Sequence, residues 1–282
     1  MRISRKALLA LVSAAALATI GATTLPATSH VDTVAAEAAA APSLAGTVAL
    51  NNCSGSIIRF ATSQDTDKAV MMTNGHCLES GMPGAGQVIV NKPSTRSATL
   101  LNATGGSLGT VKATSIMYGT MTDTDVALYQ LSSTYAQIKA LKFEALPFSA
   151  SHPTDGTLID IPSGYWKKTY QCGIEGFVYQ LKEGAWTWKD SIRYGMECQA
   201  EHGSSGSPIV DRATRTVIGI NNTGNDEGQR CTVNNPCEVD QAGNVKVDKG
   251  RSYGEQTYQI NGCLGAGSTI DLNKAGCTLA KP

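Results

Sequence analysis

The chain has 282 residues, of which 16% are charged, and its 23 basic and 23 acidic residues give a formal net charge of zero. This length is ample for a buried core and could hold one large all-β domain or two smaller ones. The neutral balance, without runs of like charge, argues against a nucleic-acid partner and against a membrane-surface patch, so we expect neither.

The first 27 residues have the layout of a secretory signal peptide. Basic residues at positions 2, 5 and 6 precede an apolar stretch over about 7–25, and small residues follow it. A membrane anchor is the alternative, because the stretch approaches the length that spans a bilayer. We expect cleavage, after Ala27 or within residues 35–41, and therefore a secreted protein with no membrane contact after signal removal.

The next segment, residues 28–43, is rich in alanine and is interpreted as a linker or short pro-segment. From Thr47 onward, short β-type runs separated by Gly, Asn, Pro and Asp are typical of an antiparallel barrel or sandwich rather than of βαβ units. The expected strands cover residues 55–62, 69–73, 87–90, 107–117, 125–131, 156–161, 176–181, 186–194, 208–211, 216–221, 245–247 and 256–260. They form two sets of about six with a divide near 140–155. Only two stretches are predicted to be helical: residues 132–140, and a turn or two that opens at 268–271 and is closed by Gly276.

All eight cysteines follow the predicted signal peptide. An even number in an exported chain indicates a disulfide framework. A zinc site is the competing interpretation, but no Cys-x-x-Cys pair occurs, so we predict no metal. The eight are Cys53, Cys77, Cys172, Cys198, Cys231, Cys237, Cys263 and Cys277.

A glycine-rich turn at residues 203–208 (Gly-Ser-Ser-Gly-Ser-Pro) carries the candidate nucleophile, Ser205, directly before an apolar run. Glycines on both sides allow the tight backbone turn that exposes such a hydroxyl. The N–H groups of Gly203 and Ser205 could converge on a developing oxyanion. Taken alone, the stretch is equally compatible with a Gly/Ser surface loop.

Two strand ends carry candidate partners for this serine. His76 follows the apolar run 70–73, and Asp125 directly precedes the run 126–128, with Asp123 as its rival. Each residue alone is more common as a surface histidine or a turn aspartate. An α/β-hydrolase layout is excluded by chain order, because no histidine follows His202.

Four segments together resemble the motifs of the chymotrypsin-like (trypsin-like) serine peptidases. They are Cys-Ser-Gly-Ser-Ile-Ile at 53–58, Thr-Asn-Gly-His-Cys at 73–77, Asp-Val-Ala-Leu at 125–128 and Gly-Ser-Ser-Gly-Ser-Pro at 203–208. The resemblance implies an all-β fold of two six-stranded antiparallel Greek-key β-barrels, at 44–145 and 146–282, with the active site between them. It implies that Ser205 attacks the scissile carbonyl, that His76 is the general base and that Asp125 orients the histidine.

The resemblance also implies a Cys53–Cys77 disulfide. Cys231–Cys237 would close a small loop, Cys263–Cys277 would fix the C-terminal turn, and Cys172–Cys198 would brace the approach to Ser205. A Cys198–Cys231 bridge across the specificity pocket stays open as the family's alternative.

Alignment with the family places the specificity pocket at seven positions. They are Gln199, Ala200, Asn221, Asn222, Thr223, Gly224 and Gln256. No aspartate stands at the pocket base, so we expect a polar or small substrate side chain rather than Arg or Lys. The serine motif is closer to the bacterial glutamyl-endopeptidase-like branch, but Asn221 stands where that branch usually has histidine. Ser204 replaces the aspartate that pairs with the new N-terminus in trypsin-type members.

The sequence therefore predicts a secreted, monomeric serine endopeptidase that hydrolyses protein or peptide substrates through an acyl-enzyme and needs no cofactor. The alternatives are a catalytically inactive protease-like binding protein and an esterase or amidase using the same site. His152 and His202 are interpreted as loop residues, and the acidic segment 225–227 as a turn rather than a calcium loop.

Overall fold

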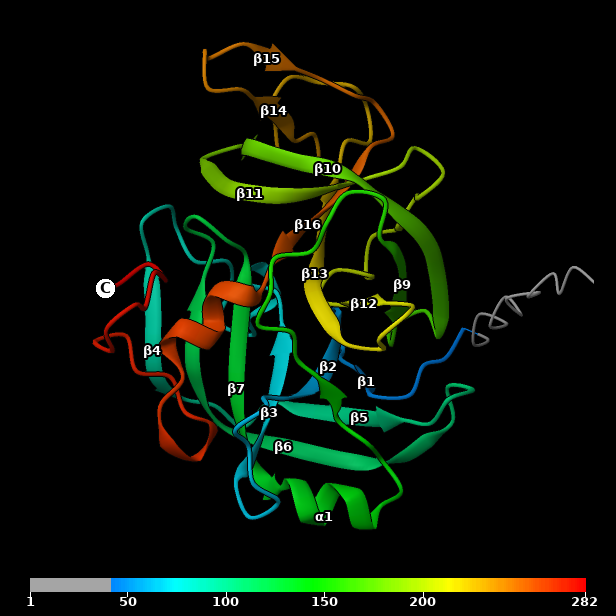
Figure 1. Cartoon of the computed structure of the whole chain (residues 1–282), viewed down its shortest axis with the longest axis vertical. Coiled ribbons are helices and arrows are strands. Elements are labelled where there is room, and N and C mark those ends of the chain that lie inside the picture. The colour runs from blue at the N-terminus through cyan, green and yellow to red at the C-terminus, as the bar shows by residue number, and fades with distance from the viewer. Residues whose placement is uncertain (1–41) are drawn as a thin grey trace, which may run out of the picture. The chain divides into compact units, whose positions relative to one another are not determined.

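The computed structural model describes residues 42–282. The predicted signal peptide and most of the alanine-rich segment lie outside these residues. Two β-sheets make up the framework of the described chain (Figure 1). Among residues 42–282, no helix is long and apolar enough to cross a membrane.

The first sheet contains a closed ring of six antiparallel strands in the order β1-β5-β6-β7-β3-β2, because β2 also pairs with β1. Two further strands extend it, β4 on β6 and β8 parallel to β2. Its strands are β1 (Thr47–Ala49), β2 (Ser54–Arg59), β3 (Lys68–Thr73), β4 (Val88–Pro93), β5 (Ser97–Leu101), β6 (Ser107–Thr120), β7 (Val126–Thr134) and β8 (Leu146–Pro147).

The second sheet closes in the same way, in the order β11-β16-β13-β12-β9-β10, because β10 also pairs with β11. Its strands are β9 (Leu158–Ser163), β10 (Lys168–Glu183), β11 (Trp186–Tyr194), β12 (Pro208–Asp211), β13 (Val217–Gly224), β14 (Cys237–Val239), β15 (Val245–Lys246) and β16 (Ser252–Gln256). The predicted all-β class with two antiparallel barrels is confirmed.

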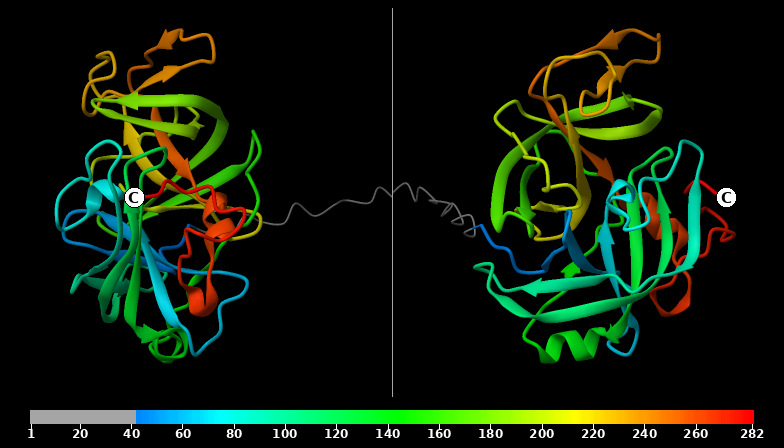
Figure 2. Two further views of the ribbon diagram at one scale, coloured as in Figure 1. Left: turned by 90° about the vertical axis from the view of Figure 1, so that its left-hand side faces the viewer. Right: turned by 180° about the vertical axis from the view of Figure 1, so that it is seen from behind.

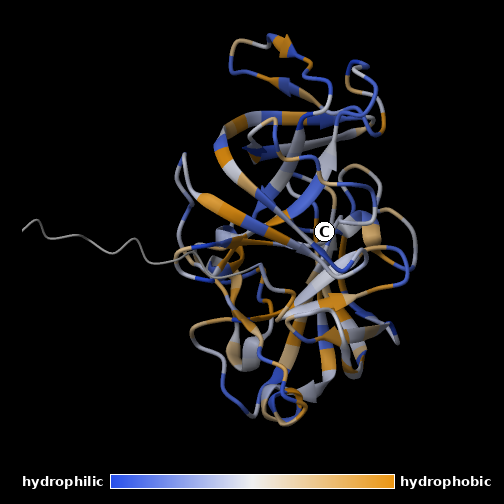
Figure 3. Ribbon diagram, turned by 90° about the vertical axis from the view of Figure 1, so that its right-hand side faces the viewer, coloured by the Kyte–Doolittle hydropathy of each residue, from blue (hydrophilic) through white to orange (hydrophobic). Residues whose placement is uncertain are grey.

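Strands β3 and β7 are buried on both faces, which explains why their sequences are almost continuously apolar. Alternate side chains of a strand point to opposite faces. Met71 and Tyr129 therefore enter the core of the first barrel, whereas Met72 and Leu128 enter a second cluster shared with Val210 of the other sheet. Figure 3 shows hydrophobic residues (orange) recurring along the strands, interrupted by hydrophilic ones. Two-sided packing fixes the ends of β3 and β7 firmly.

Three short 3-10 turns and one α-helix complete the described elements. They are α1 (Tyr135–Ala140), η1 (Gly75–Cys77), η2 (Tyr258–Cys263) and η3 (Ala266–Ser268). The predicted helix over 132–140 begins only at Tyr135, because β7 continues through Thr134. That residue then caps the helix through a reciprocal pair of hydrogen bonds with Gln137.

Two predictions near the C-terminus are wrong. A strand is expected over 256–260, but the observed strand β16 ends at Gln256, where pairing with β13 stops. The chain then enters the 3-10 turn η2. The expected helical turn over 268–271 is extended beyond Ser268, because Gly265 N donates to Thr269 O and Asp271 N donates to Cys263 O. These bonds pair residues 263–265 with residues 269–271 on either side of the turn η3, so the chain after Ser268 is extended rather than helical.

The C-terminal segment returns to the first sheet (red in Figure 2). Leu279 is buried with Met117 and Tyr118, and the Tyr118 hydroxyl donates to Ala280 O at 3.2 Å. The last residues of the chain thus stabilise the barrel that carries the candidate histidine.

Candidate active site

The antiparallel pairing of β3 with β7 brings His76 and Asp125 together. Thr73, at the end of β3, pairs with Ala127, near the start of β7. Residues just after β3 and just before β7 therefore lie at the same edge of the sheet. His76 lies in the turn η1 after β3, and Asp125 immediately precedes β7.

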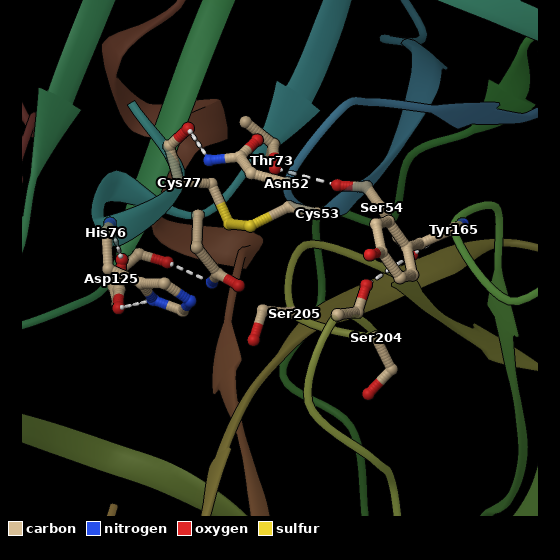
Figure 4. The surroundings of a disulfide bond; sticks show 12 residues. Asn52, Cys53, Ser54, Thr73, His76, Cys77, Asp125, Tyr165, Ser204 and Ser205 are labelled. Carbon is tan, nitrogen blue, oxygen red and sulfur yellow. Dashed lines mark hydrogen bonds and ion pairs between the residues drawn. A yellow bond between two sulfur atoms is a disulfide. The ribbon is translucent and has the colours of Figure 1, made fainter. Parts of the chain in front are cut away.

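Asp125 is completely buried and binds His76 twice. Its Oδ2 lies 2.7 Å from His76 Nδ1, and its Oδ1 accepts from the His76 backbone N–H at 3.0 Å (Figure 4). Asn74 Nδ2 donates to the Asp125 backbone carbonyl at 2.7 Å. The contact leaves no room beside it, because a Cβ on Gly75 would lie 2.1 Å from Thr120 O and 3.0 Å from Asp125 Oδ1. Only glycine fits at that position.

The rival aspartate takes no part in this contact. Asp123 is half exposed and forms an ion pair with Lys189 at 2.8 Å. Of the two aspartates, only Asp125 contacts the histidine in the described part of the chain.

The electrostatic balance at His76 favours its protonated form. Burial by itself lowers the pKa of the imidazole, but the negative charge of Asp125 and the hydrogen bond to it outweigh burial. The pKa of His76 is therefore raised above its ordinary value of 6.5. Its side chain keeps 18% of its surface exposed and so stays accessible to a substrate.

Ser205 is carried by the turn before β12 and is connected to the first sheet through β2. Its carbonyl accepts from Ser54 N at 2.8 Å, and Thr73 Oγ1 donates to Ser54 O at 2.8 Å. The turn fits closely here, because a Cβ on Gly206 (φ +82°) would lie 2.2 Å from Ser54 O. The end of β3, which leads to His76, and the turn that carries Ser205 are thus linked through Ser54 of β2.

Ser205 and His76 line the same cleft, which has a volume of about 330 Å³ and also reaches Asp125. Within residues 42–282, however, no hydrogen bond joins Ser205 Oγ to the imidazole; the hydroxyl donates to Asn222 O at 3.1 Å. The structure thus brings the three candidate catalytic residues into one cleft, with the serine hydroxyl directed to a backbone carbonyl.

The candidate oxyanion donors are both available. Gly203 adopts φ +89°, and neither its N–H nor that of Ser205 donates to another group within residues 42–282. Two unused backbone donors beside the candidate nucleophile are what an oxyanion site requires.

The predicted specificity pocket is only partly assembled. Ala200, Asn221, Asn222, Thr223 and Gly224 line the cleft. Gln199 is exposed and does not line it. Gln256 faces a different cavity, where its Nε2 lies 2.7 Å from His152 Nε2 and 3.0 Å from Asp190 O. These two pocket assignments are wrong: Gln199 is exposed to solvent outside the cleft, and Gln256, at the end of β16, faces the other cavity.

Sequence reasoning missed the apolar and acidic groups along the cleft. The apolar residues are Met82, Met121, Trp186, Trp188 and Val233. Glu183 lines the same cleft; it accepts from Thr223 Oγ1 at 2.6 Å and from Asn234 N at 2.8 Å, and burial raises its pKa. The Trp-Thr-Trp sequence at 186–188 could have indicated this wall, since residues two apart share one face of a strand.

The position after Gly203 has a neutral environment. Ser204 is buried, accepts from Asn221 Nδ2 at 3.1 Å and donates to Glu201 O. Asn221 Oδ1 in turn accepts from the Tyr194 hydroxyl at 3.2 Å. Behind the cleft, Glu255 is completely buried; it accepts from Asn222 Nδ2 at 2.9 Å and from the Ser191 hydroxyl at 3.0 Å.

Four disulfides fix the framework around the cleft. Cys53–Cys77 lies next to His76, and the predicted pairing is confirmed (Figure 4). Cys172–Cys198, Cys231–Cys237 and Cys263–Cys277 are also paired as expected, and the Cys198–Cys231 alternative is not formed. His202 lies at the rim, mostly exposed and 2.6 Å from Asp226.

Comparison with known proteins gives one family match. The model of the "Trypsin-like peptidase domain" matches residues 53–220, more than half of the chain. That span includes all three candidate catalytic residues. No curated protein matches the chain.

Solved structures with a similar chain path include three bacterial proteases. The MamO protease domain from Magnetospirillum magneticum is 15% identical with a TM-score of 0.48, covering 80% of this chain and 98% of that one. The Rv3671c protease from M. tuberculosis, in its active form, is 16% identical with a TM-score of 0.47, covering 86% and 84%. Nocardiopsis protease is 14% identical with a TM-score of 0.41, covering 75% and 90%.

Proposed function

Since the chain belongs to the trypsin-like peptidase domain family, we propose that it is a secreted serine endopeptidase whose triad is Ser205, His76 and Asp125. The observation that carries this proposal is the contact of His76 Nδ1 with Oδ2 of the buried Asp125, 2.7 Å apart, in a cleft that also contains Ser205.

The pair gives the histidine one defined tautomer. Asp125 accepts the Nδ1 proton, so Nε2 of the neutral ring carries the lone pair that can take a proton from Ser205. When Nε2 becomes protonated, the buried carboxylate stabilises the imidazolium. The same interaction with Asp125 stabilises the protonated ring in the absence of substrate, and this raises the pKa of His76.

Attack requires the Ser205 hydroxyl to leave the Asn222 carbonyl and turn toward His76 Nε2. The oxygen then adds to the scissile carbonyl, and His76 passes the proton to the leaving amine, which gives an acyl-enzyme and a free amino terminus. Water, deprotonated by His76, hydrolyses the ester and restores the serine. The N–H groups of Gly203 and Ser205 would stabilise the oxyanion in both steps.

For specificity, we propose a small or polar side chain at the cleaved position. Ala200 and Asn221 line the cleft where the pocket is expected, and Glu201 and Asp226 line the same cleft. The motif Gly-Ser-Ser-Gly-Ser-Pro supports placement near the glutamyl-endopeptidase-like branch, whereas Asn221 and the two nearby carboxylates argue against a strict preference for glutamate.

We further propose that residues 1–27 are removed as a signal peptide, that 28–43 is a pro-segment or linker, and that 44–145 and 146–282 are the two barrel domains of a monomer. The basic and apolar layout of the N-terminus supports export. Four disulfides agree with an oxidising compartment.

An inactive, protease-like binding protein is the second candidate. The bond from Ser205 Oγ to Asn222 O favours it, because a hydroxyl held by a carbonyl is not activated. The two functions differ in whether the hydroxyl can reorient.

A fluorophosphonate probe followed by peptide mass mapping distinguishes them. We expect an adduct on Ser205 of the mature protein, and none on His76→Ala or on protein unfolded beforehand. Absence of an adduct on folded, processed wild type would favour the binding protein. Matched amide and ester substrates then separate a peptidase from an esterase by their relative turnover.

A further inference from the structure

The loop between β9 and β10 (residues 164–167) contacts the backbone that precedes Ser205, and none of its residues lines the cleft. Trp166 Nε1 donates to His202 O at 2.7 Å. Ser54 Oγ donates to the next carbonyl, Gly203 O, at 3.0 Å. Both carbonyl groups that flank the Gly203 N–H along the chain are therefore fixed by side-chain donors.

We propose that Trp166 and Ser54 are positioning residues that keep the Gly203 N–H directed at the oxyanion. The inference rests on the proposed peptidase function and adds to it the groups that keep the oxyanion hole in working geometry. Trp166 does not line the cleft and its indole N–H is bonded to His202 O, so we infer that it acts through the His202–Gly203 peptide.

The geometry follows from the planar trans peptide. The described chain has no cis peptide bond, so the His202 carbonyl and the Gly203 N–H point in opposite directions. Fixing the carbonyl at the indole therefore turns the N–H away from Trp166. His202 and Gly203 line the cleft on their other side, together with Ser205.

Glycine makes such an anchor necessary. Gly203 adopts φ +89°, and glycine adopts positive and negative φ about equally well. Local conformation alone therefore does not oppose rotation of the His202–Gly203 peptide, which would put a carbonyl where the N–H donor is required. Hydrogen bonds to the two carbonyls supply the missing preference.

The donor and acceptor positions of the Ser54 hydroxyl are all occupied by hydrogen bonds. It is completely buried, and its hydroxyl oxygen accepts from Tyr165 N at 3.1 Å while its proton goes to Gly203 O. The Ser163 hydroxyl, 2.9 Å away, fills the remaining acceptor position of Ser54 and itself accepts from Trp166 N at 3.3 Å. Every donor thus has one acceptor, which gives the network a single direction.

Packing holds the loop against this backbone. A Cβ on Gly203 would lie 2.8 Å from Tyr165 Cδ1 and 3.3 Å from Trp166 Nε1, and the two aromatic rings meet edge-to-face at 5.0 Å. Gly164 lets the loop lie on the first barrel, since a Cβ there would be 2.1 Å from Val48 O. Both barrels therefore contribute to the position of one N–H.

The test compares Trp166→Phe with the matched control Tyr165→Phe. The first keeps an aromatic ring but loses the indole donor, and the second removes a hydroxyl that makes no hydrogen bond within residues 42–282. For Trp166→Phe we expect kcat to fall on the order of 3- to 10-fold with KM within about 2-fold, because only transition-state stabilisation is lost. The rate of fluorophosphonate labelling and the affinity for a peptide aldehyde should fall by the same factor.

Further variants separate positioning from packing. Trp166→His, which keeps a ring N–H, should recover part of the lost kcat, and Ser54→Ala should reproduce the loss. Thermal unfolding identifies any variant that is not folded at the assay temperature. An active wild type with Trp166→Phe equal to Tyr165→Phe, or changed in KM alone, would overturn this inference while leaving the peptidase. An inactive wild type would overturn both.

Discussion

Asp125 accepts from both the ring and the backbone of His76, at 2.7 and 3.0 Å, and has no surface exposed to solvent. The second bond fixes the turn that carries the histidine, so one carboxylate positions both the ring and its backbone. An asparagine at position 125 would have the same size but no negative charge, and only its amide oxygen could accept a hydrogen bond.

We therefore expect Asp125→Asn to lower kcat by about 10⁴-fold, since the ring loses its favoured tautomer. Asp123→Asn is the matched control. It removes only a half-exposed ion pair with Lys189, so its turnover should stay within about 2-fold. Steady-state hydrolysis of one fluorogenic peptide by both variants gives the comparison. Equal losses in the two would contradict the assignment of Asp125.

The raised pKa of His76 predicts the acid side of the pH profile. The general base must be neutral, so kcat/KM should increase with pH through a midpoint above about 6.5. The histidine binds its proton more tightly in the folded protein than in the unfolded chain, so its pairing with Asp125 stabilises the fold below the ordinary pKa. This contribution disappears as pH rises through the raised pKa. In Asp125→Asn the midpoint should move down, because the charge that raises it is gone; a midpoint that does not move would show that another group titrates.

Much of this site could be predicted because its residues are next to strong local signals. His76 and Asp125 each adjoin an apolar run, and antiparallel pairing of those runs joins them without further information. The disulfide beside His76 followed from the resemblance of Cys53 and Cys77 to a family motif. For these residues, the local sequence pattern and the order of the motifs along the chain were sufficient for the prediction.

The wall of the cleft could not be predicted in this way. Glu183 and Trp186 line it because they form the last pair of the long hairpin of β10 with β11, and the position of that end beside the active site depends on tertiary packing. The sequence assigns Gln256 to the wrong cavity for the same reason. It is the last residue of β16, and the point at which that strand ends determines which cavity its side chain faces. Sequence spacing does not determine where a strand stops.

The neutral network at Ser204 predicts that restoring the trypsin-type aspartate is harmful. Ser204→Asp would put a carboxylate beside Glu201 O and Asn221, and no cation contacts Ser204 within residues 42–282. A buried charge without a partner costs about 3–5 kcal/mol, whereas Ser204→Ala leaves neutral groups unpaired at about 1–3 kcal/mol. Urea unfolding at pH 7 measures both variants. A Ser204→Asp protein as stable as wild type would mean that a compensating cation is present.

Glu255 provides a test of buried acidity behind the cleft. Burial raises its pKa well above 4.5, although hydrogen bonds from Asn222 and Ser191 act in the opposite direction. Because the folded state holds this proton more tightly, the associated stability is complete below the unfolded pKa and is lost as pH rises through the folded value.

Glu255→Gln should therefore flatten the decline of stability with pH. The amide can accept from Asn222 and donate to the Ser191 hydroxyl, as a protonated carboxyl would. We expect the variant to match wild type near pH 4.5 and to exceed it at pH 8 in urea unfolding. Asp240→Asn, at an exposed turn where hydrogen bonds from Asn244 lower the carboxyl pKa, serves as the control and should not flatten the profile. A wild type whose stability rises steadily from pH 4.5 to 8, with Glu255→Gln running parallel to it, would mean that Glu255 is ionised in the folded protein.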